Sequence, residues 1–443
     1  MDQRFLLEKY QMDKSDRLNM NKPLGCKKVC IVSFTPVFDE PRVCRQARAL
    51  YEAGADVTVI GYKGRGKCPS FWNFIELNLH PQISSSKTPS PLSKQKNILL
   101  KIMNVGIVRI SQYAKRFQKL SLLLLSRFSK HAAISFFWRN HEYQNVKKNI
   151  PPVAADLYIA HDYFTLPIAL YLSSIHPGKV AFDAHEHATT QYAHSLWFRW
   201  IEAPYVHSLQ EYLFPHVHCF TTVCDGIADL LKKEYHLPQK PFVIRSTPFY
   251  EAHDFKKTDP KNITLLYHGG ISPMRGLEEV IESAPSWHDH LTMIMRGHGD
   301  PHYINKLKEI IKNYSLCNKI RIESSVAASR LVSYAHRDAD IGYFAQPQIS
   351  PQKRYTLPNK FFEYTMAGLC LVVNKGYEMK KLCDHYQNGV FVNSLTKEDI
   401  AHCLNSLTPE VIDRCKEKSL HAAKELCFDR EGEKMIQEYA SLF

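Results

Sequence analysis

Apolar and polar positions alternate along most of this chain in two recurring patterns, one typical of short buried strands and one typical of amphipathic helices. Between two of the apolar runs, Val43, Ala47 and Leu50 recur at helical spacing, and Gly54 follows as a helix-ending residue. Short apolar strands separated by helices indicate a parallel sheet that is covered on both faces. The candidate strands span residues 29–34, 57–61, 157–160, 180–183 and 217–223 in the first half, and 263–268, 291–296, 320–323, 341–345, 371–374 and 390–392 in the second.

The alternation of strands and helices occurs in each half of the chain, which predicts two α/β domains. The length of 443 residues agrees, because a single hydrophobic core rarely grows beyond about 250–300 residues. Pro238, Pro241 and Pro248 bracket a short strand, expected over 243–245 between the halves, as in an interdomain hinge. We expect a polar tail over residues 1–26, a first domain over 27–246, a second domain over 247–427 and a final helix within 428–443.

The formal net charge is +13, and much of the excess falls in one stretch. Residues 94–148 are rich in Lys and Arg and contain a single acid, Glu142. Within them, apolar residues recur at roughly helical spacing over 97–130, which predicts a basic amphipathic insertion in the first domain. Two interpretations stay open: a helix packed on the sheet with a solvated basic face, or a face that contacts an anionic membrane surface. Nucleic-acid binding is disfavoured, because no recognition motif accompanies the charge.

Targeting and redox signals favour the cytoplasm. The N-terminal residues mix charges of both signs, and the densest apolar run, over 120–125, is far too short to span a bilayer. The 12 cysteines are scattered without paired CxxC motifs, which disfavours a zinc ribbon, and a chain of this size needs no disulfides. We expect a cytoplasmic protein, peripheral on the inner face of the cell membrane if the basic insertion binds lipid.

Polar residues follow three strands of the first half, at the sheet edge where parallel α/β sheets bind their ligands. Asp39 lies in the loop after the first strand, His161 directly follows the strand over 157–160, and His185 belongs to a DAHEH string after the strand over 180–183. We predict that these three residues form the catalytic part of the functional site. The alternatives are a helix cap for Asp39 and surface loops for the histidines. The string also admits a metal ion, but no further ligand spacing supports one, so we expect none.

Two glycine-rich segments follow neighbouring strands of the second half. Gly269, Gly270 and Arg275 follow the first strand, while Arg296 and Gly297 end the next. Glycine lets the backbone approach a phosphate closely, and Arg can bind two phosphate oxygens at once. The pair predicts a pyrophosphate site. The absence of GxGxxG disfavours a dinucleotide site of the dehydrogenase type.

The most specific segment is LPNKFFEYTMAG over 357–368. Pro358 suits the first turn of a helix, whose unpaired N–H groups and partial positive charge attract phosphates. Glu363 can accept hydrogen bonds from both hydroxyls of a ribose. We therefore place Pro358, Asn359, Lys360 and Glu363 in a nucleotide-binding site. The alternative is an ordinary amphipathic helix with an exposed Glu.

Together these segments resemble the retaining GT-B glycosyltransferases of glycosyltransferase family 4, over about residues 27–430. The resemblance rests on DEPRVCRQARALYEAGADVTVIG, AHDYFTLPIALYL, FDAHE, TTVCDGIADLL, YHGGISPMRGLEEVIESA, RGHGD and LPNKFFEYTMAGLCLVV. It implies two Rossmann-like, doubly wound parallel-sheet domains that face each other across a cleft. The N-terminal domain would bind a glycan or lipid-linked acceptor, and the C-terminal domain a UDP- or GDP-sugar donor, without a cofactor or metal.

The resemblance also implies roles for single residues. Glu363 would bind the donor ribose, Arg275 would replace a phosphate-binding Lys, and His185 would lie near the transferred sugar. The C-terminal helix would cross back to the first domain. Two positions depart from the pattern: Tyr355 stands where many members carry a second glutamate, and Gly270 where many carry arginine. The identity of the sugar is therefore open.

The implied activity is sugar transfer to an acceptor hydroxyl with retention, in the synthesis of a lipid-linked glycan or surface polysaccharide. The basic insertion favours a lipid-bound acceptor. Two alternatives remain, a sugar-nucleotide epimerase or hydrolase of similar fold and a non-catalytic nucleotide-sugar-binding protein, because fold by itself does not specify function.

Overall fold

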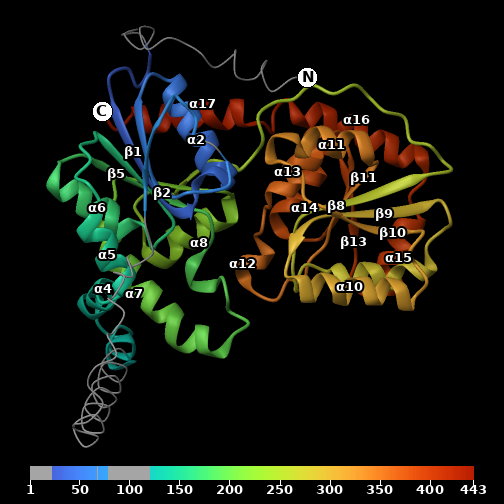
Figure 1. Ribbon diagram of the computed structural model, residues 1–443, viewed down its shortest axis with the longest axis horizontal. Helices are drawn as coiled ribbons and strands as arrows, with labels where there is room; N and C mark the ends of the chain where they lie inside the picture. The colour runs from blue at the N-terminus through green and yellow to red at the C-terminus, as the bar shows by residue number, and fades with distance from the viewer. Residues whose placement is uncertain (1–21, 67, 78–119) are drawn as a thin grey trace, which may run out of the picture.

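The computed structural model describes residues 22–66, 68–77 and 120–443, and these form two α/β domains that lie side by side (Figure 1). Residues 1–21 of the tail expected over 1–26, and residues 94–119 of the insertion expected over 94–148, lie outside the described residues. No helix of the described residues is long and apolar enough to cross a membrane.

The N-terminal domain is built on a parallel sheet, seven-stranded over the described residues, with the order β3-β2-β1-β4-β5-β6-β7. In β1 (Lys28–Pro36), Val29 and Ile31 join one buried cluster, whereas Cys30 and Val32 join another. Helices cover both faces of the sheet, which is why β1 is a continuous apolar run. The other strands are β2 (Asp56–Tyr62), β3 (Asn73–Glu76), β4 (Leu157–His161), β5 (Lys179–Ala184), β6 (Cys219–Thr222) and β7 (Phe242–Val243). The α-helices are α2 (Pro41–Glu52), α4 (Lys130–Trp138), α5 (His141–Asn149), α6 (Leu166–Ile175), α7 (Ala203–Leu213) and α8 (Asp225–Tyr235).

The C-terminal domain has a six-stranded parallel sheet with the order β10-β9-β8-β11-β12-β13 over the described residues. Its strands are β8 (Ile263–Ile271), β9 (Leu291–Gly299), β10 (Ile320–Ser324), β11 (Ile341–Phe344), β12 (Cys370–Asn374) and β13 (Gly389–Val392). Its helices are α9 (Leu277–Ser283), α10 (Pro301–Asn313), α11 (Leu331–Asp338), α12 (Pro351–Arg354), α13 (Asn359–Met366), α14 (Tyr377–Tyr386), α15 (Lys397–Asn405) and α16 (Pro409–Ala423).

Both sheets reverse their strand order at one point, between β1 and β4 in the first and between β8 and β11 in the second. Loops that leave neighbouring strands in opposite directions open a space at such a point, so ligands bind at the carboxyl ends of these strands. The strands expected from the apolar pattern are present at both switch points. One edge strand, β3, was not expected, because it begins and ends with the polar Asn73 and Glu76, whereas the two-residue β7 overlaps the short strand expected between the prolines.

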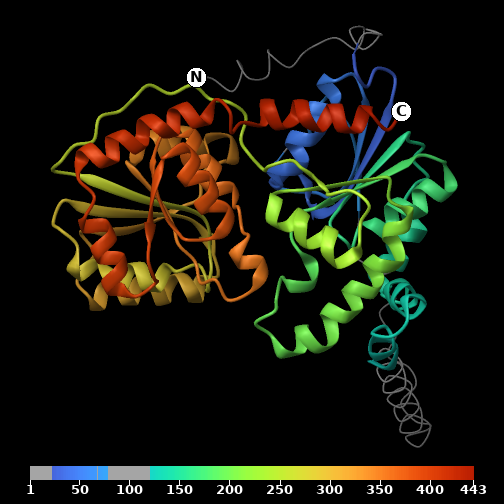
Figure 2. The ribbon, with the colours of Figure 1, turned by 180° about the vertical axis from the view of Figure 1, so that it is seen from behind.

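A final helix, α17 (Phe428–Ala440), leaves the C-terminal domain and packs against α2 of the N-terminal domain (Figure 2). Its Met435 and Tyr439 are fully buried in the cluster that also contains Val29 and Val43. At its start, the Phe428 N–H donates to the carbonyl of Pro248, 2.7 Å away. The chain therefore passes between the domains twice, once through the hinge and once at the start of α17. The hydrogen bond from Phe428 to Pro248 joins these two segments.

Candidate active site

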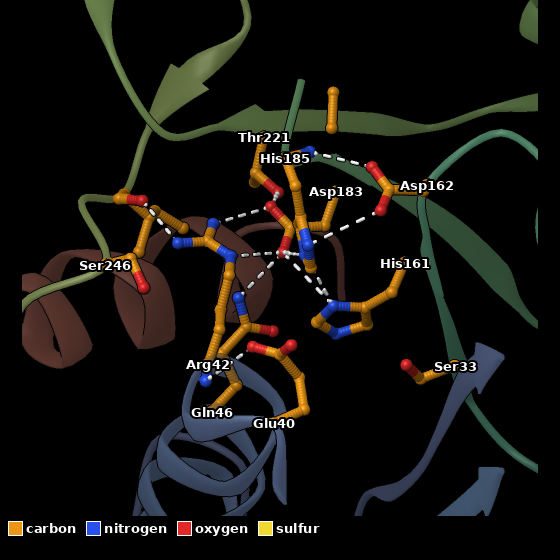
Figure 3. Close-up of polar contacts among 12 residues, drawn as sticks. Ser33, Glu40, Arg42, Gln46, His161, Asp162, Asp183, His185, Thr221 and Ser246 are labelled. Carbon is orange, nitrogen blue, oxygen red and sulfur yellow. Dashed lines mark hydrogen bonds and ion pairs between the residues drawn. The ribbon is translucent and has the colours of Figure 1, made fainter. Parts of the chain in front are cut away.

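The carboxylate of Asp183, at the end of β5, is the centre of a buried polar cluster (Figure 3). Arg42 of α2 binds both of its oxygens, with Nη2 to Oδ1 at 2.7 Å and Nε to Oδ2 at 2.8 Å. Gln46, one turn later in α2, donates to Oδ2 at 2.9 Å, and the Thr221 hydroxyl of β6 donates to Oδ1 at 2.7 Å. The remaining guanidinium nitrogen of Arg42 donates to the carbonyl of Ile244 at 2.8 Å. The cluster thus joins α2, β5, β6 and the segment that leads into the hinge.

The Arg42–Asp183 pair stays ionised despite its burial. Burial alone raises the pKa of Asp183, but the charge of Arg42 and its hydrogen bonds hold that pKa well below the usual range. Burial likewise opposes the charge of Arg42, and Asp183 overcomes it, so the pKa of Arg42 is raised. The result is a fixed negative charge at the base of the site.

Two histidines lie on this carboxylate and contact each other. Nδ1 of His161 is 2.8 Å from Nε2 of His185, and the two nitrogens lie 3.6 and 3.4 Å from Oδ2 of Asp183. Asp162 holds His185 from the other side, because its Oδ1 accepts the His185 backbone N–H at 3.0 Å and its Oδ2 lies 3.5 Å from Nδ1. The structure therefore brings the predicted His161 and His185 together.

The two histidines differ in charge. Burial lowers the pKa of His161 to about 3, so its ring is neutral. Burial also works against the charged form of His185, but the charge of Asp162 and the hydrogen bond to Asp183 outweigh it and raise its pKa to about 9. At neutral pH, His185 is a cation that donates its Nε2 proton to Nδ1 of His161. A charged imidazole suits binding and charge stabilisation better than proton abstraction.

The third predicted residue, Asp39, contacts other partners. Its Oδ2 accepts the backbone N–H of Arg65 at 3.1 Å, and its side chain is 39% exposed. A catalytic role for Asp39 remains a prediction. Sequence reasoning did not assign roles to Arg42 and Gln46; the only signal was their i, i+4 spacing on α2, which places both on one helix face.

His161, Asp183 and His185 each offer a ligand atom, and these atoms lie within 4.8 Å of one another. The cluster nevertheless fits a metal ion poorly. Both oxygens of Asp183 already accept hydrogen bonds from Arg42, and Oδ1 and Oδ2 also accept from Thr221 and Gln46, respectively. We read the group as an ion-pair network.

The glycine-rich end of β8 forms the opposite side. Gly269 adopts the left-handed region with φ of 111°, and no atom lies within 4 Å of the position where a Cβ on Gly270 would stand. The loop is fixed by the Tyr267 hydroxyl, which donates to the Gly270 carbonyl at 2.7 Å. Gly297 lies beside it on β9, where a Cβ would be 1.8 Å from the Gly269 carbonyl oxygen. Glycine is therefore required at 269 and 297, and the backbone at Gly270 is open to a ligand.

Glu363 lies against this loop on α13, whose first residue Asn359 follows Pro358. Its Oε2 is 2.8 Å from Nε2 of His268, the last residue of β8 before the glycines. Burial raises the pKa of Glu363, but the bond to His268 and the charges of Lys360 and Arg45 prevail and lower it. The carboxylate is therefore charged and held in place, as an acceptor of hydroxyl groups requires.

Two cationic side chains face the same loop. Lys360 lies with Nζ and Cε 2.8 and 2.9 Å from the Cβ position of Gly269. Burial and the charge of Arg275 lower the pKa of Lys360 to about 8. Among the salt bridges of the described residues, none includes Lys360 or Arg275. Their charges are available to an anionic ligand.

Arg296 differs from these two cations. Its Nη2 lies 2.7 Å from Oε2 of Glu323 and 2.6 Å from Oδ2 of Asp338, and only 5% of its side chain is exposed. Two carboxylates thus already balance its charge. Donor binding by Arg296 remains a prediction, but the structure gives its guanidinium a different set of partners.

The two sides of the site are joined by direct contacts between domains. The backbone N–H of His187 donates to Oε1 of Gln352 at 2.7 Å. The N–H of Gly226, at the start of α8, donates to Oε1 of Glu378 at 2.6 Å. The ring of Tyr355 lies so close to Gly226 that a Cβ there would be 2.1 Å away. Tyr355 is therefore a packing residue between the domains.

Comparison with known proteins adds a partial family match and the fold. Residues 249–417 match the family model described as glycosyl transferases group 1, and no curated protein sequence matches the chain. Similar solved structures include HepE from Anabaena in complex with UDP and glucose, with 12% identity, a TM-score of 0.60 and coverage of 94% of this chain and 100% of that one. Sucrose-phosphate synthase from Thermosynechococcus elongatus has 12% identity, a TM-score of 0.64 and coverage of 94% and 99%. WaaG, a glycosyltransferase involved in lipopolysaccharide biosynthesis, has 14% identity, a TM-score of 0.59 and coverage of 92% and 98%.

At these identities the structural likeness establishes the fold, and the predicted GT-B architecture is confirmed. The matched family covers the domain that carries Gly269, Gly270, Arg275, Lys360 and Glu363. The match over residues 249–417 supports a glycosyltransferase, and the solved structures show the fold in which that segment lies.

Proposed function

We propose that this chain transfers a sugar from a UDP- or GDP-sugar to an acceptor hydroxyl with retention of configuration. The observation that carries the proposal is the fixed, charged Glu363 beside the open backbone of Gly270, with Lys360 and Arg275 next to them. A carboxylate for ribose and two cations for phosphates are the groups that a nucleoside diphosphate needs. HepE has been solved with UDP-glucose bound, which supports a UDP-sugar as donor.

In this proposal, the C-terminal domain stabilises the departing diphosphate. Lys360, Arg275 and the first N–H groups of α13 would stabilise the charge that develops on the leaving oxygen. His185 lies on the opposite side as a cation held by Asp162 and Asp183. It would bind the transferred sugar while the acceptor hydroxyl attacks from the face that the diphosphate leaves. Chemistry of this kind needs no metal, and transfer is expected to persist in EDTA.

We further propose that the acceptor is a lipid-linked glycan or a growing surface polysaccharide. The support is the basic stretch over 94–148 and the exposure of Leu120 and Leu124 at its described end. A catalytic site fed from a membrane places the enzyme at the inner face of the cell membrane, as a peripheral protein.

A thermal-shift screen against UDP, GDP, ADP, CMP and NAD tests the donor site first. Saturation at about 100 times Kd would stabilise the folded protein by about 2.7 kcal/mol, so UDP or GDP should raise Tm clearly. Glu363→Gln should abolish most of that shift, because the neutral amide has one acceptor oxygen in place of two for the ribose hydroxyls and for the N–H of His268. The matched control is Glu282→Gln, an exposed glutamate of α9, which should leave the shift unchanged.

Product analysis then separates transfer from its alternatives. Incubation with a UDP-sugar and a candidate acceptor should release UDP together with a glycoside of unchanged anomeric configuration by NMR. Free sugar or an epimerised nucleotide sugar as the only product would replace the proposal with hydrolysis or epimerisation. Stabilisation by NAD without stabilisation by any nucleoside diphosphate would overturn it.

A further inference from the structure

An exposed aromatic projection follows the active-site histidines directly in the chain. We define the aromatic spur as residues 192–200, which follow η3 (Ala188–Thr190) and extend into the π-helical turn η4 (Phe198–Glu202). Four large side chains of the spur are at least half exposed: Tyr192 at 50%, Leu196 at 64%, Trp197 at 54% and Trp200 at 61%. So many large apolar groups on one short segment indicate a contact surface.

The spur is held in a defined shape. Phe198 points inward, is only 5% exposed and contacts the ring of Tyr192 edge-on at 5.4 Å. The indole Nε1–H of Trp197 donates to Oε1 of Glu202 at 2.9 Å. With Phe198 as an anchor, Trp197 and Trp200 are presented outward from a fixed base. Their exposure is therefore a property of the fold.

A second apolar tip lies on the same domain. At the described end of the basic stretch, Leu125 is 56% exposed and Phe128 is 85% exposed. The guanidinium of Arg127 lies 5.7 Å from the Phe128 ring centre. In both ribbon views, this segment and the turn that precedes α7 lie at the lower edge of the N-terminal domain (Figures 1 and 2).

We propose that the aromatic spur inserts into the interface of a lipid bilayer, with the segment around Phe128 as a second contact. Two separate convex tips at one edge of a domain fit a deformable planar surface. Trp and Tyr are the side chains that favour the boundary between headgroups and acyl chains, because their rings are apolar and their N–H or O–H groups remain hydrated. Arg127 and the exposed Arg199 supply positive charge for anionic headgroups at the same edge.

The spur would bring the bilayer to the base of the active site. It begins only a few residues after His185, whose ring lies on Asp183, and after His187, whose N–H binds Gln352 of the other domain. A glycan carried on a membrane lipid would therefore reach His185 along the spur. This consequence rests on the proposed function, whereas bilayer binding by the spur does not.

Tryptophan fluorescence provides a direct test, because the spur holds two of the five tryptophans of the chain. Phosphatidylcholine vesicles with and without phosphatidylglycerol are added to the full chain. We expect a blue shift of the emission and co-sedimentation with the vesicles, both stronger with the anionic lipid. The double variant Trp197→Ser, Trp200→Ser should lose the shift and lower the vesicle partition coefficient by about tenfold or more, because it removes the largest apolar groups of the spur.

The matched control is Tyr377→Ser, which removes a 59% exposed aromatic ring from α14 of the C-terminal domain and should not change vesicle binding. The spur variant should keep the Tm shift with UDP, so loss of vesicle binding is separable from failure of the donor site. Two results would overturn the proposal. One is vesicle binding that survives the double variant. The other is self-association of the chain without vesicles, measured by sedimentation velocity, that by itself shifts the tryptophan emission.

Discussion

At the scale of single residues, the active site depends on how a few buried charges are shared. Asp183 has two oxygens, and Arg42 binds both of them, so the histidines meet a carboxylate whose charge is already partly balanced. Asp162 supplies the second negative charge, and it acts on His185 rather than on His161. The difference in pKa between the two histidines, about 9 and about 3, follows from this placement. One ring is fixed as the cation of the pair and the other as its acceptor.

The same reasoning makes donor binding depend on pH through Lys360. Its pKa is lowered to about 8 in the free protein, and a phosphate stabilises the charged ammonium, so binding raises that pKa. UDP affinity should therefore fall as the pH rises through about 8. Calorimetric titration from pH 6.5 to 9.5 measures this. Lys360→Arg should remove the pH dependence, because guanidinium stays charged, and a dependence that persists in this variant would contradict the assignment.

At the scale of elements, α17 holds the two domains together through one buried carboxylate. Glu431 is 1% exposed, and its oxygens accept from the Arg245 backbone N–H at 3.0 Å, Arg245 Nη1 at 3.2 Å and Lys434 at 3.0 Å. Arg245 directly follows Ile244, whose carbonyl binds Arg42. The C-terminal helix is thus connected to the catalytic cluster through two consecutive residues.

Removing this carboxylate should destabilise the protein. Glu431→Ala leaves a buried N–H and a partly buried guanidinium without their acceptor, at a cost of about 1–3 kcal/mol in the free energy of unfolding. Glu433, two positions later, is 63% exposed and pairs only with Arg430 at 3.4 Å. Glu433→Ala should change stability by less than about 0.5 kcal/mol. Urea denaturation of both variants measures the two effects. Equal destabilisation of both variants would indicate a general effect of charge on α17 and would contradict a specific role of Glu431.

At the scale of the whole molecule, the contacts between α8 and α14 set how closely the two domains approach. Glu378 accepts the N–H of Gly226 at 2.6 Å, and Lys381 of the same helix binds Asp225 at 2.9 Å. Tyr355 packs on Gly226 next to them. Helix α8 belongs to the domain that carries His185, and α14 belongs to the domain that carries Glu363. Contacts between the two helices therefore favour the arrangement in which both domains face the same ligand.

Glu378→Ala should therefore shift the free protein towards a more open arrangement. Small-angle X-ray scattering should show a larger radius of gyration without ligand, and saturating UDP should restore the compact value. The apparent Kd for UDP should rise, by up to about tenfold if only a tenth of the molecules remain closed. Glu398→Ala, at a 71% exposed residue of α15, is the control and should change neither quantity. An unchanged radius of gyration in Glu378→Ala would assign closure to other contacts.

The sequence by itself determined the elements of this protein and the edge of the sheet at which chemistry is placed. Apolar periodicity is a local property, so the strands that flank both switch points and the amphipathic α2 and α13 were predictable. His161, His185, Gly269, Gly270 and Glu363 are predicted as site residues for the same reason, because each lies within two residues of the end of a predicted strand or on a predicted helix. The short edge strand β3 lacks a buried apolar run and gave no such signal.

Only the tertiary structure decided which charges meet. Arg42 and Asp183 lie 141 positions apart, and no local pattern states that they pair. Arg296 was grouped with Arg275 as a phosphate ligand, but packing places it between Glu323 and Asp338. Tyr355 and Glu378 of the C-terminal domain contact Gly226 of the other domain, and the large side chains of the aromatic spur remain exposed. None of this could be read from local sequence. Burial and the field of nearby charges depend on atoms from distant segments, so the protonation states of the site follow from the folded chain alone.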